Sequence, residues 1–225
     1  MTLASLKTVF KKRLSKDHTW VILVFMIFIF PKFNDAGWTV VNFMFYRFQY
    51  KMTEKMYGNL LSTWIVLNLF SQMFVVPFLS NTMKLRDTSI LVLALALAAL
   101  GFFAEAFFTQ TWVMFAIWSV FYFFYLNIDS TTKSVMSKLI EPTEVGKAFA
   151  VFGVLQSCLA LIAKPFYGFM YQASLDIFAG LWLIVSSGFL FISLAITIIL
   201  HFGMKNSEQK TEIKKVICKD DKIQV

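Results

Sequence analysis

Charged side chains are scarce in this sequence, at 15% of its 225 residues, while hydrophobic side chains make up 58%. A soluble domain usually has about 25% charged and about 45–50% apolar residues. No soluble domain of this length could bury 27 Phe and 11 Met side chains. The shortage of charge therefore excludes a soluble protein and predicts an integral membrane protein.

Cysteine and histidine are almost absent, with two residues of each. Cys158 lies in an apolar stretch and Cys218 in the tail, a pattern that excludes a disulfide framework and a zinc site. The two histidines lie at opposite ends of the chain, and the sequence has no paired-histidine metal motif, no Gly-x-Ser-x-Gly turn and no phosphate-binding glycine loop. We therefore expect neither an enzyme nor a bound metal or cofactor.

Long apolar runs take up most of the sequence. Each run comes near the roughly 20 residues that a helix needs to cross a bilayer, and none has the alternating polar positions of a barrel strand. We therefore predict an all-α, integral membrane bundle of six transmembrane helices. The predicted spans are 20–46, 58–80, 88–108, 112–137, 146–171 and 177–201.

The predicted transmembrane domain thus covers residues 20–201, between a basic segment at 1–19 and a charged, disordered tail at 202–225. Lys and Arg side chains near span ends predict its orientation, because cytoplasmic loops carry an excess of them. With the N-terminus inside, fifteen lie on the cytoplasmic side and three on the opposite side. Both termini are therefore expected to be cytoplasmic.

The net charge of +8 is explained by these basic residues beside the spans, and we expect no nucleic-acid partner.

Six ionisable residues lie at membrane depth, where each costs roughly 2.5–3.5 kcal/mol to insert and is a functional candidate. They are Lys32, Asp35, Glu105, Asp129, Lys133 and Lys164. The first two are spaced i,i+3 and Asp129 and Lys133 i,i+4, so each pair can meet on one helix face. One pair lies in the first span and the other in the fourth. This placement predicts two three-helix repeats, as in transporters built from inverted repeats around a midplane site.

These residues indicate a pathway for a small solute and protons. Asp129 or Asp35 could gain and lose a proton as access alternates between the two sides. Lys133 could receive an organic anion, and Asn127 could line the same wet face. The alternative is that both pairs are structural ion pairs, sealed inside a non-transporting interaction or assembly protein.

Two further charges differ in their setting. Lys164 precedes Pro165 in the middle of the fifth span, where Pro165 is expected to kink the helix. A lysine at that depth needs a carboxylate, a carbonyl or a cavity, and we count it among the pathway candidates. Glu105 lies near the end of its span, so we expect its side chain to reach the outer interface.

The junction of the fourth and fifth spans resembles a known family. The segments KSVMSKLI at 133–140 and EVGKAF at 144–149 are similar to the loop between helices ten and eleven of the proton-coupled folate transporter family, solute carrier family 46. The basic segment FKKR at 10–13 and the segment PFY at 165–167 resemble the family more weakly. The similarity is good over about residues 130–170 and loose over most of the rest.

That family belongs to the major facilitator superfamily, and the resemblance implies a proton-coupled or organic-anion carrier of the plasma or lysosomal membrane. The six spans would be the C-terminal half of a twelve-helix transporter, with the first and fourth helices lining its cavity. Lys133 falls where the family carries a cationic residue, usually arginine, and lysine loses the bidentate geometry. A half cannot build a two-bundle cavity alone. We therefore expect a fragment, a chain that pairs with a second copy or half, or a degenerate non-transporter.

Overall fold

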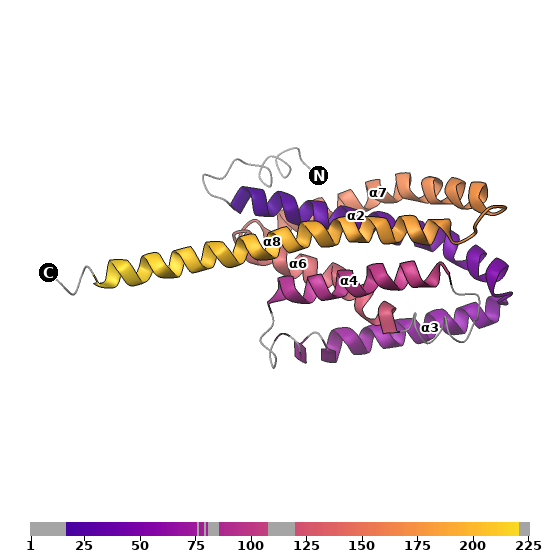
Figure 1. Ribbon diagram of the computed structural model, residues 1–225, viewed down its shortest axis with the longest axis horizontal. Coiled ribbons are helices and arrows are strands. Elements are labelled where there is room, and N and C mark those ends of the chain that lie inside the picture. Colours follow the sequence, from indigo (N-terminus) through magenta and orange to yellow (C-terminus); the bar gives the residue numbers. More distant parts are fainter. Residues whose placement is uncertain (1–16, 76, 79, 81–85, 108–119, 221–225) are drawn as a thin grey trace.

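The computed structural model describes residues 17–75, 77, 78, 80, 86–107 and 120–220, and all regular structure in this part of the chain is helical (Figure 1). In chain order, the elements are α2 (Asp17–Gln49), α3 (Glu54–Phe70), the short π-helix η1 (Ser71–Val75), α4 (Asp87–Glu105), α6 (Asn127–Leu139), α7 (Val145–Ser174) and α8 (Leu181–Asp220). The predicted all-α class is confirmed for these residues.

Four of the helices are long and apolar enough to cross a membrane, which supports an integral membrane protein. These spans are Thr19–Gln49, Asp87–Glu105, Val145–Ser174 and Leu181–Met204. The expected second span corresponds to α3, with 17 residues, followed by η1. The expected fourth span begins outside the described residues; from residue 120 it continues as helix to a turn at Leu126, after which α6 begins. Six spans therefore stay a prediction.

Small residues let α4 and α8 pack closely, as is usual between membrane helices. Ala94, Ala98 and Ala99 of α4 are buried. The buried Ser187 of α8 donates its hydroxyl hydrogen to the backbone carbonyl of Ala99, at 2.9 Å. The helices are thus held by van der Waals contact and by a hydroxyl that finds its acceptor on the neighbouring helix.

The first and last long helices meet at one end of the bundle. Gly203 of α8 lies against the Trp20 ring near the start of α2. At the same end, His201 of α8 is hydrogen-bonded to Thr88 at the start of α4, at 2.8 Å. The start of α2 and the late part of α8 therefore lie at the same end of the bundle, and the side of the membrane that this end faces stays a prediction.

The charged tail was predicted to be disordered, but the structure makes it helical as far as Asp220. Helix α8 continues past Met204 to Asp220 and projects beyond the other helices (Figure 1). Residues 205–220 hold several Lys, Glu and Gln, which have high helix propensity. The charged composition of this segment therefore does not prevent it from continuing the helix.

Gly37 of α2 provides a test of the packing between α2 and α7. A Cβ atom at this position would overlap the ring of Tyr167, which is fully buried. Gly37→Ala should therefore destabilise the protein by about 1–3 kcal/mol, the usual cost of overpacking. Gly153→Ala is the matched control, because a Cβ there meets nothing within 4 Å. It should leave stability unchanged or raise it slightly. Equal thermal unfolding temperatures for both variants in detergent would contradict the packing.

Candidate functional site

The site begins where α2 contains Pro31. Proline has no N–H to donate, so the carbonyl of Ile27, one turn earlier, lacks its helical partner. Ser193 of α8 fills this gap by donating its hydroxyl to that carbonyl at 3.1 Å. The neighbouring helix thus satisfies the backbone, and α2 continues through Pro31 into Lys32 and Asp35.

Helix α6 is held in place at its later turns. Ser134 and Lys138 of α6 both donate to Oδ2 of Asp87 at the start of α4, the Lys138 Nζ at 2.7 Å. At the start of α6, the buried Asn127 donates to the hydroxyl of Ser71 in η1 at 2.7 Å. These contacts fix the rotation of α6 and so direct the side chain of Asp129 toward α2.

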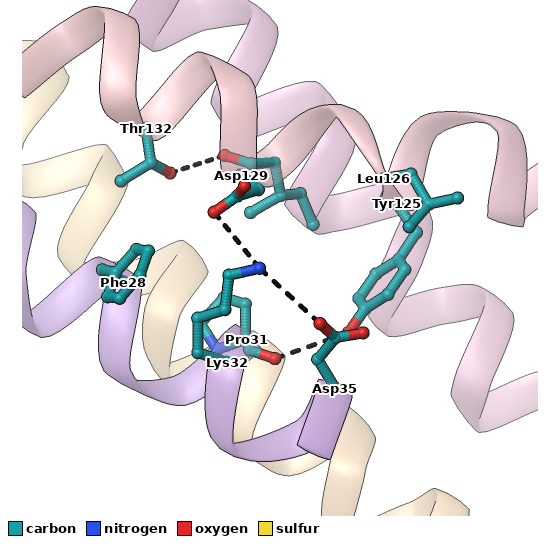
Figure 2. Close-up of a pocket in the computed structure, with 9 residues that line it drawn as sticks. Phe28, Pro31, Lys32, Asp35, Tyr125, Leu126, Asp129 and Thr132 are labelled. Atoms are coloured by element: carbon teal, nitrogen blue, oxygen red, sulfur yellow. Dashed lines mark hydrogen bonds and ion pairs between the residues drawn. The ribbon is translucent and has the colours of Figure 1, made fainter. Parts of the chain in front are cut away.

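The two predicted charge pairs form one cluster of four residues, of which Figure 2 draws Lys32, Asp35 and Asp129. Lys133 Nζ lies 2.8 Å from Asp129 Oδ2, and Lys32 Nζ lies 3.6 Å from Asp35 Oδ2. Lys32 Nζ also lies 3.2 Å from Asp129 Oδ1, which joins α2 to α6. Figure 2 shows the ammonium of Lys32 between the two carboxylates. The charge cluster therefore holds two cations and two anions, with Lys32 at its centre.

The charge cluster is only partly buried. The Lys32 side chain is 12% exposed, whereas the other three side chains are 34–39% exposed. A pocket with about 30 Å³ of space for water adjoins it, and a water needs about 10–15 Å³ on this measure. Its lining residues are Phe28, Pro31, Lys32, Asp35, Tyr125, Leu126, Ile128, Asp129 and Thr132.

Tyr125 closes one wall of the pocket, and the sequence analysis did not single it out. Its hydroxyl donates to the carbonyl of Pro31 at 3.4 Å, and Asn34 Nδ2 lies 3.5 Å from the same hydroxyl oxygen. Tyr125 thus ties the segment before α6 to the turn of α2 that carries Lys32. The only signal in the sequence was its position four residues before Asp129, among many aromatic residues.

The arrangement can bind a small anion if one cation is released. Lys133 is the more accessible of the two and sits in a single ion pair among the described residues. Protonation of Asp129 would remove the partner of Lys133 and weaken one contact of Lys32. A proton on Asp129 and an anion on Lys133 could therefore occupy the charge cluster together.

Two predicted pathway residues lie elsewhere. Asn127 is 2% exposed and donates to Ser71 and to the carbonyl of Phe123, so its amide holds α6 and does not line the pocket. Lys164 is exposed on α7, lies outside the pocket and makes no ion pair among the described residues. No group of three or more His, Cys, Asp or Glu suited to a metal occurs in the part of the chain that the structure describes.

The side chain of Glu105 was expected to reach the outer interface, and the structure places it elsewhere. Its side chain is buried, at 2% exposure, and Oε1 accepts a hydrogen bond from the hydroxyl of Tyr46 at 2.5 Å. It therefore does not reach the interface. The rotation of α4 turns Glu105 toward α2, and its distance from the span end in sequence could not show this.

The chain is similar to curated transporters over part of its length. Solute carrier family 46 member 2 of Mus musculus is 29% identical over 128 residues, 55% of this chain and 26% of that protein. The proton-coupled folate transporters of Rattus norvegicus and Bos taurus are 28% and 26% identical over 123 residues, 52% of this chain and 27% of each. The matched stretch spans about a quarter of each relative. No family model matches the chain.

This weak homology supports a relationship to solute carrier family 46 transporters. The four apolar spans support an integral membrane protein, and the curated proteins that the chain resembles are solute carriers.

Proposed function

We propose that this chain moves a small organic anion across a membrane together with protons, by alternating access, and that the charge cluster is its binding site. The observation that carries the proposal is the half-open cluster of Lys32, Asp35, Asp129 and Lys133 between two helices. Charges at membrane depth are costly and persist where a function needs them. A purely structural network would be expected to be sealed, and three of these four side chains are more than one third exposed.

The relatives suggest the first solutes to test. Two of them are named as proton-coupled folate transporters, and folate is an organic anion with two carboxylates. Lys133 would bind one carboxylate, while Asp129 would carry the proton that releases Lys133. The pocket beside the charge cluster is too small for folate in the conformation described, so binding requires the cluster to open on its exposed side.

We further propose that the chain forms half of a major-facilitator-type transporter and works with a second half or a second copy. The support lies on α7, where Lys164, Gln156 and Ser157 are exposed in a span. A lysine in mid-span is not expected to face lipid chains. The missing neighbour would complete the cavity. Six spans, with both termini cytoplasmic in a plasma or lysosomal membrane, complete this proposal.

Uptake by the full 225-residue chain tests the function. Cells that express it should accumulate labelled folate or another small organic anion faster at acidic than at neutral outer pH, above cells without it. A solute panel of anions, cations and neutral molecules identifies the class. Normal surface expression with no uptake of any anion, alone or with a co-expressed family 46 N-terminal half, would overturn the proposal and favour an assembly role.

A further inference from the structure

A buried carboxylate, that of Glu105, lies far from the charge cluster, at the opposite end of α4 from Asp87. Oε1 of Glu105 accepts from Tyr46, and Oε2 is buried with no hydrogen-bond partner among the described residues. Tyr46 follows Asp35 by eleven residues on α2, which places it about 16 Å further along the helix axis. Glu105 is thus separate from the candidate solute site but linked to it through one helix.

No cation compensates Glu105 in the part of the chain that the structure describes. The titratable groups that interact with it are Tyr46 of α2 and Tyr50 just after that helix, and Tyr57 of α3 lies beside Tyr46. The titratable side chains that α8 and α6 bring to α4 lie at its other end, where His201 contacts Thr88 and Lys138 contacts Asp87. Glu105 therefore sits among tyrosines without an ion pair.

A carboxylate in this setting is a proton acceptor. Burying an ionised carboxylate with a single hydrogen-bond donor costs far more than burying a carboxylic acid. The same neighbourhood holds a buried acceptor that lacks a donor, the Oδ1 atom of Asn42. Asn42 donates to the hydroxyl of Tyr57, whose ring centroid lies 5.9 Å from that of Tyr46. A hydrogen on Oε2 of Glu105 that bonds to Oδ1 of Asn42, directly or through a water, would give both of these buried atoms a hydrogen-bond partner.

We propose that Glu105 is a second proton-binding site, which holds a proton on Oε2 in the arrangement described and releases it when α2 moves away from α4. The proton comes from water at the end of the bundle where α4 ends, and it returns to water there. Tyr46 keeps its own hydrogen throughout. Because Tyr46, Lys32 and Asp35 lie on α2, a movement of α2 that breaks the Tyr46–Glu105 bond also moves Lys32 and Asp35. This coupling role rests on the proposed transport function; the proton-binding chemistry does not.

Infrared difference spectroscopy of the full chain in lipid bilayers tests the site without any solute. The wild type should show the carbonyl band of a buried carboxylic acid, and raising the pH should remove it. Glu105→Gln should abolish the band, Tyr46→Phe should shift its frequency because it removes the donor to Oε1, and Asp35→Asn should leave it in place. A carbonyl spectrum of Glu105→Gln identical to that of the wild type, or no such band in the folded wild type at any pH, would overturn the proposal. If Glu105→Gln does not fold, an unshifted band in Tyr46→Phe has the same meaning.

Transport assays then separate this inference from the proposed function. In Glu105→Gln, uptake against a solute gradient should be lost, while exchange of labelled for unlabelled solute persists because the charge cluster is intact. A Glu105 band without any uptake leaves the proton site standing and rejects the transport proposal. Uptake that responds to pH in Glu105→Gln as in the wild type rejects the coupling role of Glu105 alone.

Discussion

Lys32→Ala should destabilise the protein by about 2–4 kcal/mol, because it leaves the carboxylates of Asp35 and Asp129 facing each other without the cation between them. Breaking a fully buried pair costs about 3–5 kcal/mol. The expected value here is lower because these carboxylates are 39% and 34% exposed and water screens part of the repulsion. Thermal or denaturant unfolding of the purified chain in detergent measures the change.

A second variant separates charge from packing. Lys32→Ala combined with Asp35→Ala leaves Asp129 and Lys133 as a neutral pair. The double variant should therefore be more stable than Lys32→Ala alone by about 1 kcal/mol, the coupling expected for groups in contact. Lys55→Ala is the matched control, since that lysine is exposed just inside α3, and it should change stability by less than about 0.5 kcal/mol. A double variant that is no more stable than Lys32→Ala would show that Lys32 does not offset the charge of Asp35.

Lys133→Ala should weaken solute binding about 10- to 100-fold, the loss expected when a hydrogen bond to a charged group is removed. The KM for uptake should rise, while folding changes little because Asp129 keeps its contact with Lys32 at 3.2 Å. Lys133→Arg keeps the charge and should retain most of the affinity. The measurement is concentration-dependent uptake of the solute identified by the panel, normalised to surface expression.

The control for Lys133 is Lys147→Ala. Lys147 is exposed near the start of α7 and, unlike Lys133, forms no ion pair with the charge cluster. Its uptake should match the wild type within about twofold, since isolated surface charges contribute little. An unchanged KM in Lys133→Ala, with the same value in Lys147→Ala, would remove Lys133 from the solute site.

The sequence predicted each charge pair but not the contact of Lys32 with Asp129, which joins the two pairs into one cluster. Spacings of three and four residues are enough to bring Lys32 to Asp35 and Asp129 to Lys133, because helix geometry is local. The contact of Lys32 with Asp129 depends on the rotation of α6 against α2. That rotation is set by Asp87, Ser71 and the packing of α4, none of which a spacing rule contains.

For Glu105 and Lys164, the sequence indicated the depth of each residue along its span but not the direction of its side chain. Depth along a span could be estimated from the sequence, and it placed Glu105 near an end and Lys164 in the middle. The face that each side chain presents depends on helix packing: Glu105 turns inward to Tyr46, and Lys164 lies on the exposed side of α7. Charge and position therefore identified candidates, while tertiary packing decided which of them share a site.

The length of the final helix shows why composition can mislead. The residues after Gly203 are polar and charged, which favours disorder when judged by core formation alone. They also favour helix by intrinsic propensity, and α8 already supplies a nucleus on which each further turn adds at little cost. The structure follows propensity as far as Asp220.

The central claim, that the charge cluster couples an organic anion to a proton, is tested most directly by proton movement in proteoliposomes. The full chain is reconstituted with a pH-sensitive dye inside, and an inward gradient of the transported anion is imposed with no initial pH gradient. The account predicts that the interior acidifies in the wild type, and that Asp129→Asn abolishes the acidification while the protein stays folded. Solute entry without acidification, or acidification that is the same in Asp129→Asn, would contradict it.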